Sequence, residues 1–207
     1  MPVSCRPILL DAQEKSITIF RVVSSPERLW TASEYREMPE GPPWIQLVNG
    51  QLVCEPSPGL RHQGLLLALV EALSGHVRAA HLGRVYFAPL DVYLSDHDVF
   101  QPDLIFVSCA REDILAEDGI HGAPDLTVEI VSPSSARRDS VHKLQVYRTS
   151  GVSEYWLIDP VAQTFQITHF GAHRDGTARS LQRNEVLRSP LFPGLVIVIA
   201  DLFGSGG

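Results

Sequence analysis

Lysine and cysteine are both scarce in this chain of 207 residues. Of its 17 basic residues, 15 are arginines and only two, Lys15 and Lys143, are lysines. The three cysteines, Cys5, Cys54 and Cys109, are odd in number and widely spaced. They show neither CxxC nor Cys/His spacing, which argues against a zinc site. We therefore expect reduced thiols in a cytoplasmic protein.

Long apolar runs and an excess of positive charge are also missing. No apolar segment approaches the roughly 18 residues of a membrane helix, and the N-terminal run is too short for a signal peptide. We therefore expect no membrane partner and a cytoplasmic location. Because the net charge is -7, the surface as a whole does not attract phosphate, and nucleic acid would have to bind at a local basic patch.

Repeats and low-complexity linkers are absent as well, and 44% of the residues are hydrophobic, which is ordinary for one globular domain. We expect a single domain over residues 31–207. Residues 1–30 are weakly patterned, and a possible strand at 16–23 makes them an N-terminal arm or an extra strand.

Local signals predict several elements in the first half of the chain. Thr31 and Glu34 have the spacing of a capping box that opens a short helix. Asn49-Gly50 joins two alternating runs, which is the strongest short hairpin signal. Apolar residues between 60 and 82 recur at helical spacing, and Gly83 is expected to end that helix.

Strands dominate the rest of the pattern. We expect strands at about 84–94 and 103–107, an irregular connection over 109–121, and a strand that contains Glu129. A helix capped by Ser134 or Ser135 should run to Thr149 and close at Gly151. The sequences EYWLIDP, TFQITHF and LVIVIADLF read as later strands. Few helices and many consecutive strands indicate an α+β fold with a mixed sheet.

Glu129 is unusual because it interrupts the apolar run LTVEIV. A carboxylate is costly to bury unless it is paired, protonated or bound to a cation. Asp103 opens a neighbouring strand, and two carboxylates on adjacent strands can converge on Mg²⁺. Asp125 is a poorer partner, because four strand residues separate it from Glu129 by roughly 13 Å.

Lys143 follows on the next helix. Asp139, Lys143 and Tyr147 stand at positions i, i+4 and i+8, so the three share one helical face. Lys143 could reach back to the carboxylates. Its retention as lysine in an arginine-rich chain suggests a need for a compact, rotatable ammonium rather than a planar guanidinium.

These residues resemble a known family. Pro102-Asp103, EIVSPSS at 129–135, the residues Asp139, Lys143 and Tyr147, and GVSEYWLIDP at 151–160 are similar to the Uma-two family of restriction-endonuclease-like proteins. That family is a branch of the PD-(D/E)XK nuclease superfamily. The resemblance runs from about residue 31 to 203 and includes His62 at the place of a characteristic histidine.

The resemblance implies a restriction-endonuclease-like αβββαβ core, here with an added N-terminal hairpin and C-terminal strands, and Mg²⁺-dependent phosphodiester hydrolysis. Mn²⁺ could substitute, and DNA is the expected nucleic acid. Asp103, Glu129 and the carbonyl of Ile130 would hold the metal. Lys143 would orient the water or neutralise the oxyanion, and His62 is a further catalytic candidate.

Arginines on the Lys143 helix provide the local positive charge that the whole surface lacks. Arg137, Arg138 and Arg148 are expected to contact phosphates, which position a strand without reading its bases. A homodimer is compatible with this pattern.

The sequence departs from the superfamily at two positions, and one of them, Gln46, favours an alternative together with the acidic net charge. Val131 occupies the third position of E-x-K, so the lysine role passes to Lys143. Gln46 replaces a glutamate that often starts the hairpin in relatives. The alternative is a weak or inactive nuclease-fold module that binds nucleic acid or a protein partner.

Each candidate also has a structural interpretation. Glu129 would be a satisfied structural carboxylate, and Asp103 a turn acid after proline. Lys143 would be half of an exposed pair with Asp139. His62 lies on the apolar stripe, so a core role and a catalytic role are equally supported. Asp91 and Tyr147 are more simply explained as structural residues.

Overall fold

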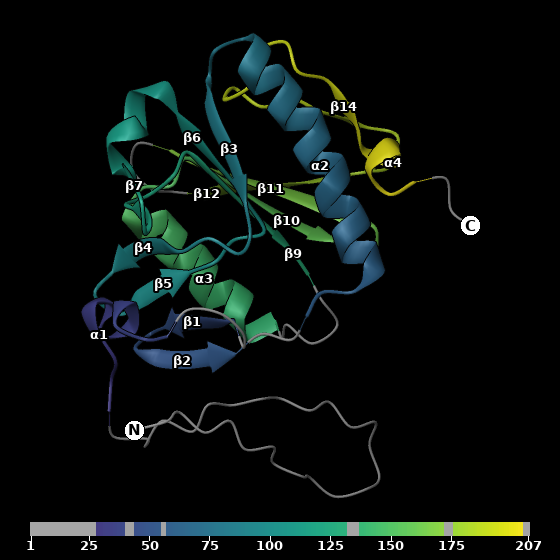
Figure 1. The fold of residues 1–207 in the computed structure, drawn as a ribbon. Coiled ribbons are helices and arrows are strands. Elements are labelled where there is room, and N and C mark those ends of the chain that lie inside the picture. Colours follow the sequence, from purple (N-terminus) through teal and green to yellow (C-terminus); the bar gives the residue numbers. More distant parts are fainter. Residues whose placement is uncertain (1–27, 40–43, 55–56, 132–136, 172–175, 205–207) are drawn as a thin grey trace, which may run out of the picture.

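The computed structural model describes residues 28–39, 44–54, 57–131, 137–171 and 176–204, with the backbone alone at 137–140. Most strands in this part of the chain belong to two six-stranded sheets (Figure 1). The possible strand at 16–23 and the caps expected at Ser134 or Ser135 lie outside the described residues, as does nearly all of the predicted N-terminal arm.

The central sheet is mixed, as the sequence predicted. Its strands in spatial order are β12 (Gly176–Leu181), β11 (Thr164–Phe170), β10 (Glu154–Asp159), β9 (Leu126–Ile130), β6 (Leu104–Ser108) and β3 (Gly83–Phe87). β9 and β10 are parallel, and the other pairs are antiparallel. Helix α3 (Arg137–Ser150) connects the parallel pair, which cannot be joined by a tight turn.

Helix α2 (Leu60–Ala79) precedes β3, so α2, β3, β6, β9, α3 and β10 form the expected αβββαβ order. The hairpin and the extra C-terminal strands predicted around that core are present too. The remaining C-terminal elements are β13 (Val186–Leu187), β14 (Ile197–Val198) and α4 (Ile199–Leu202).

The second sheet, called the outer sheet here, carries the N-terminal hairpin. Its strands in spatial order are β2 (Gln51–Cys54), β1 (Ile45–Val48), β5 (Asp98–Phe100), β4 (Val92–Ser95), β8 (Gly119–His121) and β7 (Leu115–Ala116). Short helix α1 (Ala32–Arg36) leads into it. Figure 1 shows β1, β2, β4 and β5 together on the side of α3 away from α2.

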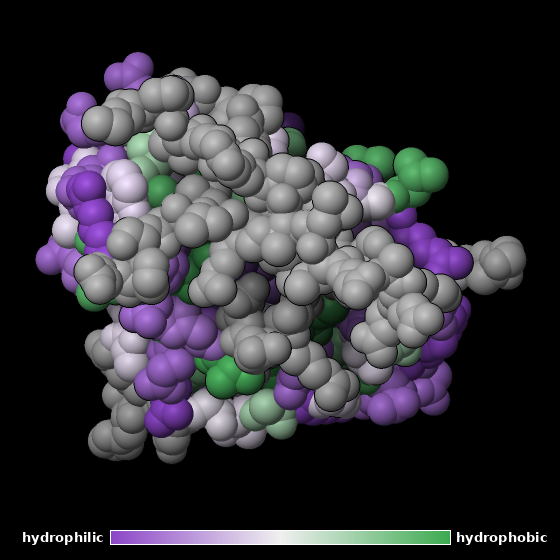
Figure 2. Space-filling view, turned by 90° about the horizontal axis from the view of Figure 1, so that it is seen from below, coloured by the Kyte–Doolittle hydropathy of each residue, from purple (hydrophilic) through white to green (hydrophobic). Residues whose placement is uncertain are grey.

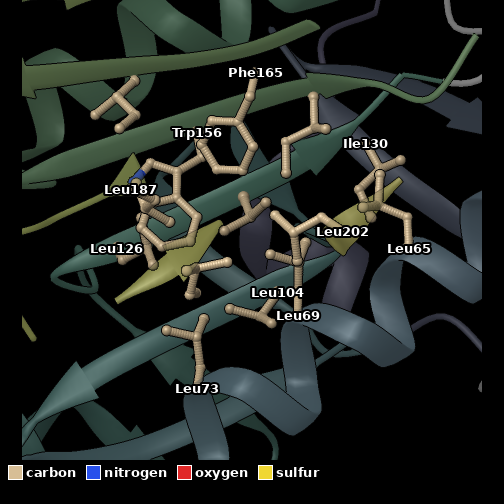
Figure 3. Packing of buried hydrophobic residues seen from close by; sticks show 14 of the residues in the cluster. Leu65, Leu69, Leu73, Leu104, Leu126, Ile130, Trp156, Phe165, Leu187 and Leu202 are labelled. Atoms are coloured by element: carbon tan, nitrogen blue, oxygen red, sulfur yellow. The ribbon is translucent and has the colours of Figure 1, made fainter. Parts of the chain in front are cut away.

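The largest apolar core fills the space between the central sheet and α2. Leu65, Leu69 and Leu73 point from α2 toward Trp156 and Phe165 of the sheet (Figure 3). Burying a side chain of this size contributes about 1.5–3 kcal/mol each. The helical stripe read from the sequence therefore fixes which face of α2 meets the sheet.

Helix α3 packs on the opposite face. Its Val146 and Tyr147 contact Tyr155 of β10 and Phe100 of β5, so α3 lies between the two sheets. Odd-numbered residues of β9 face this side, because the even-numbered Leu126, Val128 and Ile130 belong to the α2 core.

Both strongest local signals are confirmed. Glu34 N–H donates to Thr31 Oγ1 at 3.3 Å and Thr31 N–H donates to Glu34 Oε2 at 3.0 Å, which completes the capping box. Asn49 and Gly50 connect β1 to β2 with φ of 50° and 71°. Two positive φ values are what a two-residue I′ hairpin turn requires.

The strand predicted over 84–94 is wrong as a single element. β3 belongs to the central sheet and β4 to the outer sheet, with Pro89 between them. Proline has no N–H to donate to a ladder, so the chain leaves one sheet and enters the other there.

Gly83 does not end the helix either, because α2 stops at Ala79 and Gly83 begins β3. A Cβ at Gly83 would lie 2.1 Å from the carbonyl oxygen of Val107, so the glycine permits a close approach of β3 and β6.

Two further segments differ from the prediction. The connection over 109–121 contains the 3₁₀ helix η1 (Cys109–Ile114) and the hairpin β7–β8. The run LVIVIADLF is only briefly a strand, in β14, and then turns into α4. Short apolar runs do not distinguish a buried strand from a buried helix by periodicity.

Candidate active site

The two candidate carboxylates lie opposite each other in the central sheet. Leu104 pairs with Val128 in the antiparallel β6–β9 ladder, which sets Asp103 across from Glu129 one step further along. Side chains directly opposite on such strands have Cβ atoms about 4.5–5.5 Å apart and share one face. Asp103 Oδ2 also accepts the N–H of Ile130 at 2.6 Å, so it is fastened to the neighbouring strand.

Glu129 is largely buried, with 14% of its side chain exposed. Lys143 Nζ donates to both carboxylate oxygens at 3.1 Å, and the Tyr147 hydroxyl donates to Oε1 at 2.6 Å. Hydrogen bonds from a cation and a phenol offset the desolvation of the carboxylate. This arrangement explains how the sequence can keep an acid in an apolar strand.

Lys143 is buried as well, with 5% of its side chain exposed. The interpretation of Lys143 as an exposed surface residue is therefore wrong. Lys143 and Tyr147 are four residues apart on α3, so one helical face delivers both donors to Glu129.

Burial raises the pKa of the Tyr147 phenol well above its ordinary value, and the nearby charge of Glu129 raises it further. Burial likewise raises the pKa of Tyr155, with the charges of Glu129 and Asp103 acting in the same direction. Both phenols therefore stay protonated at neutral pH, which keeps Tyr147 a hydrogen-bond donor to Glu129.

His62 comes from the first turn of α2 and reaches the same place from the other side of the sheet. Its Nε2 lies 3.0 Å from Asp103 Oδ1, and its side chain is 9% exposed. His62 thus combines both interpretations made from the sequence, since it is buried beside the apolar stripe and also contacts a candidate metal ligand.

A large pocket opens over these residues. Its volume is about 1040 Å³, and its lining includes His62, Asp103, Glu129, Ile130 and Lys143. The structure therefore brings together every candidate that the sequence assigned to catalysis or metal binding.

The three arginines predicted to contact phosphate are described unequally. Arg148 lines the same pocket. Arg137 and Arg138 begin α3, but their side chains lie outside the described part of the structure.

Other acids are placed elsewhere. Asp91 accepts hydrogen bonds from the Tyr35 hydroxyl at 3.0 Å and from Gln101 Nε2 at 2.8 Å, and burial raises its pKa. Asp125 accepts the N–H of Ser108 at 2.7 Å at the far end of β9. Neither acid lines the pocket.

Gln46 and Val131, where the sequence departs from the pattern expected by resemblance, both line the pocket. Gln46 is buried, and its Oε1 accepts the N–H of Gln101 at 3.0 Å. Val131 contributes to the wall beside Ile130. Gln46 thus has a structural partner that needs an acceptor and no charge.

The sequence predicted a packing role for Tyr147, which also donates to Glu129, and it gave no prediction for Tyr155 or Trp44, which line the pocket. The spacing of Tyr147 from Lys143 was the available signal for Tyr147. Tyr155 is paired with Thr127 two rungs from Glu129, a relation that depends on the parallel register of β9 and β10. Trp44 lines the pocket from the segment before β1 and is 46% exposed.

Comparison with known proteins identifies the family of the chain. The sequence matches the Uma2 (Uma-two) family, described as "putative restriction endonuclease", over residues 32–200. The chain belongs to the Uma2 family. A comparison with curated proteins found no match.

A crystal structure of a "putative nuclease belonging to DUF820" from Anabaena variabilis ATCC 29413 is similar to this Uma2 protein. The TM-score is 0.73 with 23% sequence identity, over 84% of this chain and 97% of the other. At that identity the likeness concerns the fold. It agrees with the nuclease-like core predicted from the sequence.

Among the described residues, no helix is both long and apolar enough to cross a lipid bilayer. On the face seen in Figure 2, the visible described surface carries hydrophilic residues at both sides and small, separate hydrophobic patches.

Proposed function

We propose that this Uma2 protein is a Mg²⁺-dependent endonuclease that hydrolyses phosphodiester bonds in nucleic acid, with DNA as the expected substrate. The observation that carries the proposal is the opposition of Asp103 and Glu129 in the pocket, with Lys143 hydrogen-bonded to Glu129. The family match and the fold of the DUF820 structure support the same class of activity.

The donor set fits a hard divalent cation. Asp103 and Glu129 offer carboxylate oxygens, and the N–H of Ile130 already faces Asp103. In an extended strand the N–H and C=O of one residue face the same neighbouring strand, so the Ile130 carbonyl is oriented toward Asp103 too. Asp103, Glu129 and Ile130 would hold Mg²⁺, and Mn²⁺ could substitute.

The described residues contain no group of three or more His, Cys, Asp or Glu side chains that could hold a metal. Two carboxylates and a carbonyl suit Mg²⁺, because that ion usually keeps several waters. When bound, it would supply a water of lowered pKa and offset negative charge on the phosphate.

Lys143 would act on the charge that develops during hydrolysis. Its ammonium is held by Glu129 in a nearly water-free position, where a fixed cation is worth more than in solvent. Donating to the attacking water or to a phosphate oxygen requires only a small rotation of the flexible stem.

His62 and Tyr147 hold the two acids. His62 restrains Asp103 through Oδ1, and the backbone of Ile130 restrains it through Oδ2. Tyr147 restrains Glu129 through Oε1. His62 is also the one imidazole on the pocket wall among the described residues, and it could exchange a proton there.

Glu129→Gln tests the proposal. The amide keeps the shape of the side chain and removes its charge, so metal affinity and hydrolysis should both be lost with the fold retained. Cleavage of DNA and RNA oligonucleotides is assayed with Mg²⁺ and Mn²⁺, and metal binding is measured by calorimetry. Glu117→Gln, an exposed acid outside the pocket, is the matched control and should cleave like the wild type.

Two results would contradict the proposal. One is wild-type protein that binds neither metal and leaves every substrate intact. The other is a Glu129→Gln variant that unfolds while the wild type is indifferent to Mg²⁺, which would make Glu129 a structural acid. Either result would favour the non-catalytic binding module.

A further inference from the structure

The pocket is much larger than a site for one phosphate and one metal ion. It continues from Glu129 across β10, β11 and β12 on one face of the central sheet. The registers place Glu129 beside Leu157, Leu157 beside Gln166, and Gln166 beside Ser180, so these four residues form one row across the sheet. A second row is Tyr155, Thr168 and Ala178.

Apart from Glu129, the side chains of these rows, called the strand floor here, are uncharged. Gln166, Thr168 and Ser180 offer amide and hydroxyl groups that can both donate and accept hydrogen bonds. Asp159 is the one acid on this extension of the pocket among the described residues, and its Oδ1 accepts the N–H groups of Val161 and Ala162. A neutral polar floor suits base edges better than phosphates.

The candidate acids lie deep in this pocket rather than on a convex surface. Exposed fractions of their side chains are 14% for Glu129 and 17% for Asp103. The walls come from α2, α3, the loop around Pro89 and the segment before β1. A scissile phosphate must therefore enter a recess, which an unpaired strand can do more readily than a stacked duplex.

Trp44 stands at the rim of the same pocket with 46% of its surface exposed, although an indole is usually buried. Exposed aromatic side chains beside a nucleic-acid path serve as stacking platforms for bases. Arg148 on the α3 wall supplies positive charge for the phosphates.

We propose that the strand floor binds a single-stranded, or locally unpaired, segment of nucleic acid, with a base stacked on Trp44 and the phosphates along the α3 wall. This inference rests on the proposed nuclease function and specifies its substrate. The row from Glu129 to Ser180 crosses three strand spacings of about 4.8 Å, or roughly 14 Å. That length accommodates about four nucleotides stacked at roughly 3.4 Å each.

The experiment measures binding with hydrolysis prevented. Fluorescence anisotropy compares a twelve-residue oligothymidylate with a twelve-base-pair duplex, both with Ca²⁺ in place of Mg²⁺. The single strand should bind at least tenfold more tightly than the duplex. Trp44→Ala should weaken single-strand binding about tenfold, as expected for the loss of one base stack, and Trp44→Phe should restore most of it.

Two further variants locate the strand. Gln166→Glu places a carboxylate beneath the bases and within the same pocket as the phosphates on the α3 wall. It should weaken single-strand binding at least tenfold, because the charge is desolvated by the bases and repels the phosphates. Leu67→Ala removes an exposed apolar side chain of α2 that lies outside the pocket, and it should bind like the wild type. Thermal melting of each variant establishes that the fold is retained.

The outcomes separate this inference from the proposed function. Single-strand binding that depends on Trp44, without cleavage in Mg²⁺, would refute the proposed nuclease activity and support single-strand binding by the strand floor. Cleavage of duplex that is insensitive to Trp44→Ala and Gln166→Glu would overturn the strand floor and leave the nuclease. The strand-floor proposal is also overturned if the duplex binds as tightly as the single strand or more tightly, or if neither nucleic acid binds.

Discussion

Glu129 shows how the fold can accommodate a carboxylate inside an apolar strand. An unpaired carboxylate in a strand would cost several kcal/mol, and Lys143 and Tyr147 reduce that cost by donating three hydrogen bonds to it. The same contacts leave a charged, aligned acid beside Asp103. Hydrogen bonds within the protein therefore fix the orientation of both carboxylates.

Lys143→Arg tests whether this ammonium acts on the reacting phosphate. Arginine keeps the charge but places a wider, planar donor group in a buried position next to Glu129. We expect hydrolysis to fall by about a hundredfold or more, as for the loss of other preorganised oxyanion donors. Metal binding should persist, because both carboxylates are unchanged.

Single-turnover cleavage and calorimetry measure these two quantities. Arg78→Lys is the control, because it exchanges the same two residue types at an exposed position near the end of α2. Cleavage at the wild-type rate by Lys143→Arg would remove Lys143 from the mechanism.

Among the elements, α3 is a helix that contacts both sheets in the described part of the chain. Its Lys143 and Tyr147 reach the central sheet at Glu129, while His142 Nε2 lies 2.9 Å from Asp98 Oδ1 of the outer sheet. Asp98 in turn accepts the N–H of Asn49 in the hairpin turn. The position of Lys143 is thus tied to both sheets.

The turn of the hairpin β1–β2 depends on a glycine, and this dependence can be tested. Gly50 has φ of 71°, and a Cβ there would lie 2.9 Å from Leu29 Cδ2. Gly50→Ala should therefore destabilise the protein by about 1–2 kcal/mol, the usual cost of a left-handed conformation for other residues. Urea denaturation measures the change in the free energy of unfolding.

Gly75→Ala is the matched control within α2. A Cβ at Gly75 has open space around it, and the backbone there is helical. Alanine should raise stability by about 0.4–1 kcal/mol, because it lowers the entropy of the unfolded chain. Equal effects of the two glycine substitutions would contradict the turn geometry.

For the molecule as a whole, the C-terminal segment is joined to the central sheet through a buried acid. Ser189 Oγ donates to Glu154 Oε2 at 2.9 Å, and Trp156 Nε1 donates to Oε1 at 2.5 Å. Burial raises the pKa of Glu154 above its ordinary value of 4.5, against the opposing effect of these hydrogen bonds.

A carboxyl group with a raised pKa holds its proton more tightly in the folded state than in the unfolded state. Its contribution to stability is complete below pH 4.5 and is lost as the pH rises through the folded pKa. The stability of Glu154→Gln relative to the wild type should therefore increase between pH 4 and pH 7. Urea denaturation at several pH values measures it.

For Glu185→Gln, the stability relative to the wild type should change with pH in the opposite direction. The N–H of Gln182 and then Arg179 lower the pKa of Glu185, so its contribution is present above the ordinary value and is lost as the pH falls. Its glutamine variant should lose stability relative to the wild type as the pH rises. The same pH dependence in both variants would refute the assignment.

The sequence by itself determined what depends on neighbouring residues. The capping box at Thr31, the turn at Asn49-Gly50 and the apolar stripe of α2 are local patterns with local physical causes. The order of Asp103, Glu129 and Lys143 pointed to the candidate site in the same way, because a carboxylate inside an apolar strand is a local anomaly.

Only the tertiary structure decided which distant residues meet. The β6–β9 register sets Asp103 against Glu129, α2 brings His62 to Asp103, and α3 turns Lys143 inward. The division of residues 84–94 between two sheets is of the same kind. Such pairings depend on which apolar faces can be buried together once long loops have closed, and no short stretch of sequence contains that information.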